Sequence, residues 1–383
     1  MTIQLCDKEL CTGCSACYDI CPNKSIEMLK NDEGFLYPSI KFDSCISCGK
    51  CQEICPIINF EENTQNNFKE AYLAWCLNDE KRINSTSGGV FRVFSEASLE
   101  ENRLVVGAGF DEIFNLKHTI AENPDECKIF YGSKYLQSDM RGIYKAVQEK
   151  LQNGNSVMFS GLPCQIDAIK RFLPNDLNTK LITCELLCHG VPSPGIFSDY
   201  VKYLENKFNR KLIHYNFRSK INGWNKMSVE LTFAGKKKKS YKAKYCPYHT
   251  WFGLHISLRE SCYYCKYRSR NRNADITIGD FWGIEKLISN VDVSKGVSLI
   301  YTNNEKGKDF LEKCSDKLFL KEIDVEKSLV GRKIVLNNFE LPVLRKDFME
   351  DYKNIPMKKL IKKYPASTLL KYIILRLKIM LKK

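Results

Sequence analysis

The sequence predicts an α+β or α/β protein that consists of a short cysteine-rich module, a mixed α/β body and a C-terminal basic amphipathic helix. Three observations predict this organisation. Two runs of four cysteines lie between residues 11 and 55, segments typical of strands and helices alternate after about residue 70, and basic residues interrupt an apolar run after Pro365. Alternating strands and helices are typical of α/β domains. We therefore divide the chain into residues 1–60, 70–155, 156–345 and 346–383, of which the second and third are two parts of one body.

Both cysteine runs of the N-terminal module follow the same pattern. The first is Cys11-x-x-Cys14-x-x-Cys17-x-x-x-Cys21-Pro22, and the second repeats it from Cys45 to Pro56. In two-cluster ferredoxins the first three cysteines of such a run bind one 4Fe-4S cluster and the fourth binds the other. This rule predicts one cluster on Cys11, Cys14, Cys17 and Cys55, and a second on Cys45, Cys48, Cys51 and Cys21. Zinc favours separated pairs of ligands, so the sequence predicts a two-cluster ferredoxin-like domain that transfers electrons.

Strand and helix signals organise the rest of the chain. Between the cysteine runs, the polar turn 31–34 and the strand-like residues 35–42 predict a hairpin, and the Asn-rich residues 59–69 predict a linker. The body is predicted to hold strands at 104–110, 156–160 and 181–184, with helices at 139–152 and 165–173. Three later strands, at 211–218, 226–234 and 238–245, follow one another without helices. This change of pattern indicates a mixed or antiparallel sheet.

A small-residue loop in the body is a candidate binding site. Ser85-Thr86-Ser87-Gly88-Gly89 precedes a predicted helix at 90–97. Free amides at a helix N-terminus favour a phosphate group. A Ser or Thr cap beside a flexible Gly pair would give the same sequence, so both interpretations stay open on these residues alone.

Ten cysteines lie outside the two runs. Four of them stand in distinctive settings and make up one complete set of thiolates: Cys164, Cys188, Cys262 and Cys265. A third 4Fe-4S cluster, a zinc ion or inert buried thiols would each suit such a set. We expect the other six to be packing residues: Cys6, Cys76, Cys127, Cys184, Cys246 and Cys314.

The charge of the chain is unevenly distributed. The formal net charge is +14, yet residues 1–62 carry 5 Lys against 10 acidic residues, and residues 345–383 carry 12 basic against 3 acidic residues. The basic excess therefore lies mostly in the tail, and no aromatic-and-basic RNA-binding motif accompanies it, so we do not expect nucleic-acid binding. No signal peptide or long apolar stretch is visible, which predicts a cytoplasmic protein. The tail helix predicts peripheral contact with the inner face of a membrane, although it could equally pack on a protein surface.

Several strings of the body resemble the coenzyme F(420) hydrogenase/dehydrogenase beta-subunit family. The resemblance spans roughly residues 1–320 and is carried by Tyr131–Ser138, Ser160–Gln165, Cys188–Ser193, Phe217–Lys220 with Gly223-Trp224, and Asp275–Gly283. It implies an iron–sulfur flavoprotein in which FAD exchanges a hydride with a two-electron small molecule, a deazaflavin or another organic substrate, and passes single electrons to 4Fe-4S clusters. Similar proteins also lie among bacterial surface-polysaccharide genes, which implies a link to that pathway.

The resemblance also assigns residues. It implies a third cluster on Cys164, Cys188, Cys262 and Cys265, and flavin contacts from Ser87, Gly88, Gly89, Lys134, Tyr135, Gln137 and Ser138. Asp280 and Trp282 are further candidates for the lining of the flavin pocket. The expected partner is a redox protein such as a ferredoxin. The alternative is a non-catalytic electron-transfer subunit that lacks flavin and docks to a partner enzyme. We assign no catalytic acid or base.

Overall fold

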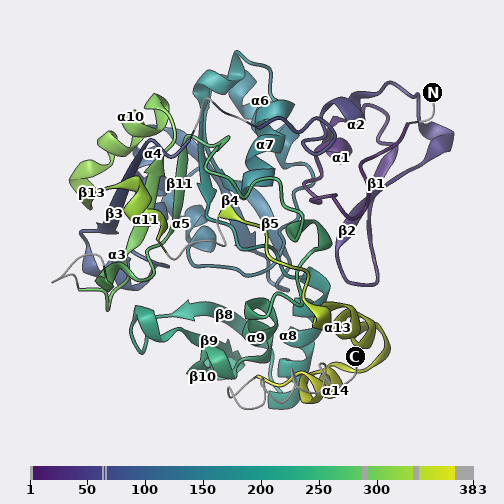
Figure 1. Cartoon of the computed structure of the whole chain (residues 1–383), viewed down its shortest axis with the longest axis vertical. Helices are drawn as coiled ribbons and strands as arrows, with labels where there is room; N and C mark the ends of the chain where they lie inside the picture. The colour runs from purple at the N-terminus through teal and green to yellow at the C-terminus, as the bar shows by residue number, and fades with distance from the viewer. Residues whose placement is uncertain (1–2, 63, 65–66, 287–291, 331–335, 367–383) are drawn as a thin grey trace.

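A computed structural model describes residues 3–62, 64, 67–286, 292–330 and 336–366 of the chain. Three parts pack together in it: an N-terminal module, a large mixed sheet covered by helices, and a small antiparallel sheet with its own helices (Figure 1). The predicted mixed α/β architecture is therefore confirmed. The basic helix predicted after Pro365 falls almost entirely at 367–383, outside the described residues. Within the described ranges, no helix combines the length and the apolar character needed to cross a bilayer.

The N-terminal module is built around a hairpin with a short helix before it and another after it. In order, its elements are α1 (Ala16–Ile20), β1 (Ile26–Lys30), β2 (Leu36–Ile40) and α2 (Lys50–Glu53). The strands pair antiparallel with Ile26 opposite Ile40, as the turn at 31–34 predicts. Gly34 is required in this turn, because its φ is +83° and a Cβ there would lie 2.6 Å from the Cα atom of Gly195. The hairpin tip thus contacts the body directly.

The large sheet has eight strands and mixed directions. In spatial order they are β13 (Leu318–Ile323), β3 (Glu70–Cys76), β12 (Ser298–Thr302), β11 (Ile276–Asp280), β7 (Leu181–Leu186), β6 (Ser156–Gly161), β4 (Arg103–Phe110) and β5 (Leu116–Ala121). The central strands β11, β7, β6 and β4 run parallel, and the outer pairings are antiparallel. β6 and β7 are almost continuously buried, which is typical of central parallel strands. We divided the body between residues 155 and 156. Because β4 lies before this boundary and pairs with β6 after it, both parts of the body share one sheet.

Helices cover both faces of this sheet. On one face, α4 (Val90–Glu100) and α10 (Glu305–Lys313) pack with Val105, Met158 and Ile182 in a single hydrophobic cluster. On the other, α6 (Ile143–Gln152) and α7 (Pro163–Phe172) pack with the neighbouring residues Val106, Phe159 and Leu181. Successive residues of these strands thus face opposite sides of the sheet, as expected of β-strands. The predicted helices at 139–152 and 165–173 are confirmed with slightly different ends.

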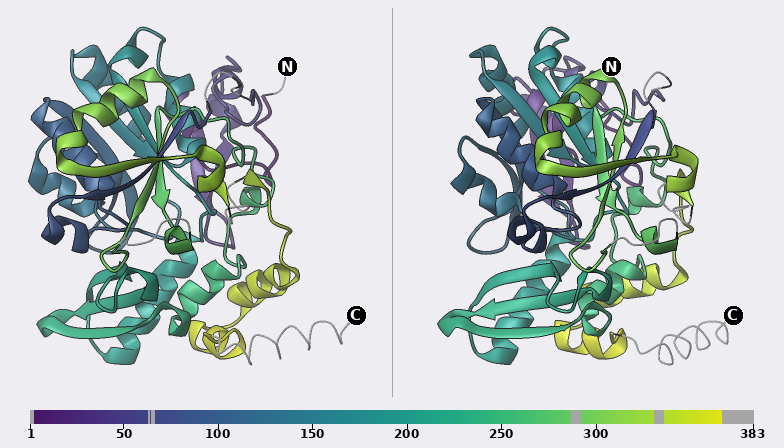
Figure 2. Two further views of the ribbon diagram at one scale, coloured as in Figure 1. Left: turned by 60° about the vertical axis from the view of Figure 1, so that its left-hand side comes forward. Right: turned by 90° about the vertical axis from the view of Figure 1, so that its left-hand side faces the viewer.

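The small sheet forms a separate layer below the large one in Figure 1. It consists of β8 (Leu212–Ser219), β9 (Ser228–Phe233) and β10 (Lys237–Lys242) in antiparallel order. Four helices pack around its core: α8 (Pro194–Phe208), α9 (Pro247–Gly253), α13 (Val343–Asn354) and α14 (Met357–Lys363). Figure 2 shows this layer from two further sides. The three successive strands were predicted, whereas their grouping with the C-terminal helices was not.

The N-terminal module docks on the start of α6. The Asp19 carboxylate accepts hydrogen bonds from the backbone amides of Gly142 (2.7 Å) and Tyr144 (3.0 Å). These amides lie at the helix N-terminus, where no intrahelical acceptor exists, so Asp19 caps α6 from another part of the chain. The Tyr144 hydroxyl then donates to the carbonyl oxygen of Cys14 at 2.9 Å. This contact ties the first cysteine loop to the body.

Candidate functional site

Three cavities lined by cysteines run from the N-terminal module into the body. The outer cavity is lined by Cys21, Cys45, Cys48 and Cys51, the four cysteines predicted to share one cluster. Gly49 has a φ of +78° and lets the chain turn sharply between Cys48 and Cys51. The amide of Ser25 donates to the Cys21 sulfur at 3.2 Å. Cys48 is exposed, so this cavity lies at the molecular surface.

The middle cavity is lined by the other predicted ligand set together with two further cysteines, Cys6 and Cys51. Its lining includes Cys11, Cys14, Cys17 and Cys55, and also Cys6. We predicted Cys6 to be a packing residue; it does pack against the hydrophobic core, and it lines the middle cavity as well. The Cys6 thiol hydrogen-bonds Cys11 and Cys55, and this contact lowers the pKa of both thiols. No sequence signal marks Cys6, because it lies outside the cysteine run.

The inner cavity brings together the four cysteines that are scattered through the body: Cys164, Cys188, Cys262 and Cys265. Cys164 lies in the first turn of α7, directly after β6, and Cys188 follows β7. Because β6 and β7 are adjacent parallel strands, their carboxyl ends meet at one edge of the sheet. Ligand sites of open α/β sheets lie at this edge. Cys262 and Cys265 approach from a connection that follows α9.

The chemistry of the inner cavity suits an anionic group bound through sulfur. Backbone amides of Gly190 and Val191 donate to the sulfur atoms of Cys188 (3.3 Å) and Cys262 (3.5 Å). Arg268 and Arg272 lie in its lining. Burial raises the pKa of Cys188 to about 11 and that of Cys262 to about 12. The thiols therefore carry protons until a metal displaces them.

The cysteine side chains of the three sites line cavities. Among the residues that the structure describes, no three His, Cys, Asp or Glu side chains are grouped closely enough to hold one metal ion. In each of the three sites, at least four cysteines surround a cavity. A structural zinc ion draws its ligands to a common point about 2.3 Å away. An iron–sulfur cube is a larger group that four thiolates can hold, so the cysteine lining of the cavities is compatible with it.

The three cavities adjoin one another in a row. Cys51 lies in the walls of both the outer and the middle cavity. Thr12 lies in the walls of both the middle and the inner cavity. Gln137 strengthens the second junction, because its amide nitrogen donates to the carbonyl oxygen of Thr12 at 2.8 Å while its side chain lines the inner cavity. The three cavities thus form a row from the surface to the edge of the large sheet.

A charged and aromatic group, here called the edge cluster, lies at the same sheet edge: Tyr135, Arg218, Trp224, Asp280 and Trp282. Asp280 ends β11 and pairs with Arg218 of β8 at 2.8 Å. Arg218 also donates to the Tyr135 hydroxyl at 2.9 Å. The Trp224 indole donates to Asp280 at 3.0 Å and stacks on Trp282 with ring centroids 4.3 Å apart. Although burial raises it, the pKa of Asp280 lies below its ordinary value because Arg218 and Trp224 stabilise the carboxylate.

The predicted flavin contacts divide between this cluster and the cysteine cavities. Tyr135 belongs to the edge cluster and Ser87 lies beside it, whereas Gln137 lies at the inner cavity. Ser138 accepts a hydrogen bond from Gln165 of α7 at 3.0 Å. Lys134 donates to the carbonyl oxygens of Ile129 (2.7 Å) and Tyr131 (3.2 Å), and burial lowers its pKa to about 7. The predicted residues are thus near one sheet edge but not in one compact group.

The Ser87–Gly89 loop is held by the large sheet itself. The amide of Gly88 donates to the Ser298 hydroxyl at 2.9 Å, and the Ser87 hydroxyl donates to the carbonyl oxygen of Val297 at 2.7 Å. A Cβ at residue 88 would lie 2.4 Å from the carbonyl oxygen of Ala74. Packing against β3 and β12 therefore explains why glycine stands at this position.

We expect Gly88→Ala to lower the free energy of unfolding by about 1–3 kcal/mol, because an extra methyl group must displace backbone in a packed interior. Urea denaturation under anaerobic conditions measures the change. Gly253→Ala is the matched control, since no atom lies within 4 Å of the Cβ it would add, and its effect should stay within about 0.5 kcal/mol. Loss of a cofactor from Gly88→Ala without loss of stability would contradict the packing explanation.

Comparison with known families agrees with this geometry. Residues 154–328 match the family that describes the C terminus of the beta subunit of coenzyme F420 hydrogenase/dehydrogenase, and residues 10–57 match a 4Fe-4S dicluster domain. Residues 154–328 of the chain are therefore similar to this F420 hydrogenase/dehydrogenase beta-subunit family. The dicluster match contains all eight cysteines of the two runs, and the beta-subunit match contains the four cysteines of the inner cavity.

One solved structure similar to this chain is a chain of the F420-reducing [NiFe] hydrogenase complex from Methanosarcina barkeri. The two are 17% identical with a TM-score of 0.48, and the match covers 79% of this chain and 94% of that one. No curated protein sequence matches the chain. The chain is therefore an iron–sulfur protein of electron transfer, related to the beta subunit of F420 hydrogenase.

Proposed function

We propose that this protein is an iron–sulfur flavoprotein oxidoreductase that passes electrons between a two-electron small molecule and a one-electron carrier protein. The observation that carries the proposal is the row of three cysteine-lined cavities, which connects an exposed cysteine to the carboxyl edge of the large sheet. A row of neighbouring one-electron centres has a use only when a donor and an acceptor lie at its two ends. We assign the carrier to the outer end and the small molecule to the sheet edge.

The three cavities would each hold one 4Fe-4S cluster. The dicluster domain supports the outer and middle clusters. The inner cluster is supported by four cysteines around one cavity, by two amide-to-sulfur hydrogen bonds and by Arg268 in the lining, which would offset part of its negative charge. Hydrogen bonds and charges of this kind set the potential of a cluster. Through these contacts the protein would set the relative reduction potentials of the successive clusters.

FAD would lie at the sheet edge between the inner cavity and the edge cluster. When bound, a flavin accepts two electrons together and releases them singly, which joins two-electron chemistry to the clusters. Seven residues would hold the flavin: Ser87, Gly88, Gly89, Lys134, Tyr135, Gln137 and Ser138. Arg218 and Asp280 would fix the wall of the site, because each is bound to the other and to a further side chain. The stacked indoles of Trp224 and Trp282 would exclude water from that wall.

The carrier protein would dock over the outer cavity. Cys48 is exposed there, and the neighbouring side chains of Ile46 and Phe42 are 60% and 62% exposed. Ile46 lies in the cavity wall itself. An apolar surface beside a redox centre brings two proteins together while keeping the transfer distance short.

We expect Ile46→Asp to slow electron exchange with a one-electron carrier protein by about tenfold, since a buried charge at the contact would cost at least about 1.4 kcal/mol. Stopped-flow bleaching of the clusters by reduced carrier measures the rate. Ile113→Asp is the control, because Ile113 is 71% exposed and lies on the turn between β4 and β5, away from the module. Equal rates in both variants would argue against docking at this surface.

A second candidate is an electron-transfer subunit without flavin that docks to a partner enzyme. It is favoured by the hydrogen bonds of Ser87, Gly88 and Lys134, since main-chain and side-chain partners of the fold already satisfy these residues. Membrane contact through the tail and a link to surface-polysaccharide synthesis remain predictions.

Anaerobic purification with cofactor analysis tests the proposal. We expect about twelve iron atoms and about twelve sulfides per chain, from three clusters, together with FAD released on denaturation. Candidate donors, namely NADH, NADPH, reduced deazaflavin and reduced ferredoxin, are then tested for bleaching of the flavin and cluster bands. Iron and sulfide without flavin would favour the second candidate. Zinc in place of iron and sulfide would overturn both.

A further inference from the structure

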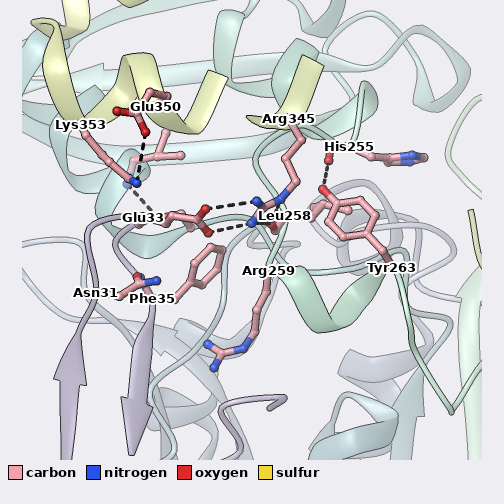
Figure 3. Close-up of polar contacts among 12 residues, drawn as sticks. Asn31, Glu33, Phe35, His255, Leu258, Arg259, Tyr263, Arg345, Glu350 and Lys353 are labelled. Atoms are coloured by element: carbon pink, nitrogen blue, oxygen red, sulfur yellow. Dashed lines mark hydrogen bonds and ion pairs between the residues drawn. The ribbon is translucent and has the colours of Figure 1, made fainter. Parts of the chain in front are cut away.

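A buried arginine lies between the middle and the inner cavity. Arg259 is 0% exposed although it carries a guanidinium group, which usually remains in contact with water. It belongs to the segment that leads to Cys262, and its side chain reaches back into the N-terminal module. Figure 3 shows Arg259 beside Phe35 of the module and close to the pair formed by Arg345 and Glu33.

The guanidinium group of Arg259 surrounds one predicted cluster ligand. Its Nε atom donates to the carbonyl oxygen of Cys11 at 2.6 Å, and its Nη2 atom lies 3.7 Å from the Cys11 sulfur. Its Nη1 atom donates to the carbonyl oxygen of Leu36 (3.1 Å) and to Gln137 (3.0 Å). The guanidinium carbon stacks 3.9 Å from the centre of the Tyr37 ring. Two of the three nitrogen atoms of the guanidinium group therefore contact Cys11 itself, and the third contacts Leu36 and Gln137.

The motif glycine of this loop makes room for the arginine. A Cβ at Gly13 would lie 2.7 Å from the Nη1 atom of Arg259. Gly13 also has a φ of +67°, which disfavours other residues. The cysteine loop and the arginine are thus fitted to each other, although about 250 residues separate them in the sequence.

What the site lacks is a carboxylate. Arg259 makes no ion pair with any Asp or Glu among the described residues, whereas the nearby Arg345 is paired with Glu33 at 2.7 Å. A buried, unpaired charge is strongly unfavourable, and hydrogen bonds to neutral carbonyl groups offset only part of that cost. The anion nearest to Arg259 would be the thiolate of Cys11 together with the cluster that it binds.

We propose that Arg259 is the counter-charge of the middle cluster and raises its reduction potential. Reduction adds one negative charge to a cluster that is already anionic, and a fixed cation at its ligand sulfur stabilises the reduced form more than the oxidised form. Because Cys262 lies three residues further on and its amide donates to the carbonyl oxygen of Arg259 at 3.0 Å, the same segment positions a ligand of the inner cavity. Arg259 therefore sets the potential of one site while its own backbone supports the next. The inference rests on a cluster in the middle cavity.

The test is a redox titration of the purified holoprotein followed by electron paramagnetic resonance. The neutral variants are Arg259→Met and Arg259→Gln, and Arg259→Lys keeps the charge. We expect the neutral variants to lower the reduction equilibrium constant of one cluster by about tenfold, which is about 59 mV for one electron. Arg259→Lys should shift it much less. The matched control is Arg82→Met, which removes another buried arginine that donates to a main-chain carbonyl oxygen, that of Gly296, instead of to the Cys11 loop, and it should leave every cluster potential unchanged.

Each other outcome has a defined meaning. Unchanged potentials in neutral variants that retain their iron overturn the proposal. Loss of one cluster from both neutral variants but not from Arg259→Lys supports it, because the charge would then be needed for binding. Loss of that cluster from all three variants overturns it, since shape rather than charge would be required. If the wild-type protein contains no iron and sulfide, the proposed function itself is contradicted. Analysis of the wild-type protein shows this before any variant is made.

Discussion

Replacing Cys164 and Cys188 together by serine is expected to remove one entire cluster, about a third of the iron and sulfide of the protein. Both residues lie at the carboxyl ends of adjacent parallel strands and supply half of the inner cavity's thiolates. Hydroxyl groups are poor ligands for iron in such clusters, and two remaining thiolates cannot hold a cube. The clusters in residues 11–55 should be retained, because none of their predicted ligands changes.

Iron and sulfide analysis and spin quantification after reduction measure this effect. Cys184→Ala is the matched control: Cys184 lies on β7, is fully buried and is outside the cavity lining, so its removal should leave the iron content unchanged. In the double variant, a flavin reduced by substrate should no longer pass its electrons to the two remaining clusters. An unchanged iron content would show that the four cysteines are inert thiols, and a loss of zinc would show a zinc site.

The second large effect is expected at the contact that holds the N-terminal module to the body. Arg345 of α13 binds Glu33 in the hairpin turn through two hydrogen bonds, of 3.1 and 2.7 Å (Figure 3). It also donates to the carbonyl oxygen of Leu258 at 3.1 Å. Both side chains are mostly buried, at 8% and 18% exposure. One residue therefore joins the hairpin, the segment that carries Arg259 and the C-terminal helix.

We expect Arg345→Met to lower the free energy of unfolding by about 3–5 kcal/mol, because it leaves the Glu33 carboxylate buried without its partner. Urea denaturation and the rate of proteolysis between the module and the body measure the loss. Combining it with Glu33→Gln gives a double-mutant cycle. The double variant should be less destabilised than the sum of the two single variants, since no charge then remains unpaired. Additive effects would show that the ion pair contributes little.

These contacts also show how far sequence reasoning reaches. The two runs of four cysteines are recognisable because three ligands of a cluster come from one short loop, so their spacing is local. The hairpin between the runs and strands β4, β6 and β7 follow from turn residues and apolar runs of adjacent residues. The four cysteines of the inner cavity could be named as a set, but on spacing alone a cluster, a zinc ion and inert thiols stayed open.

What could not be predicted depends on residues that meet only in the folded chain. Arg218 and Asp280 are separated by 62 positions, and the small sheet must pack against the edge of the large one before they pair. Cys6 carries no motif, and its place in the middle cavity is visible only once the loop of Cys11 and the end of the second run have come together.

The sequence by itself predicted the 4Fe-4S dicluster domain, with eight candidate ligands, and the mixed α/β class, because both depend on short-range patterns. The tertiary structure decided that the three cysteine cavities adjoin one another and that Arg259 lies against Cys11. The physical reason is that burial and charge pairing depend on which surfaces of the chain come into contact, and those contacts form between segments that are far apart in the sequence.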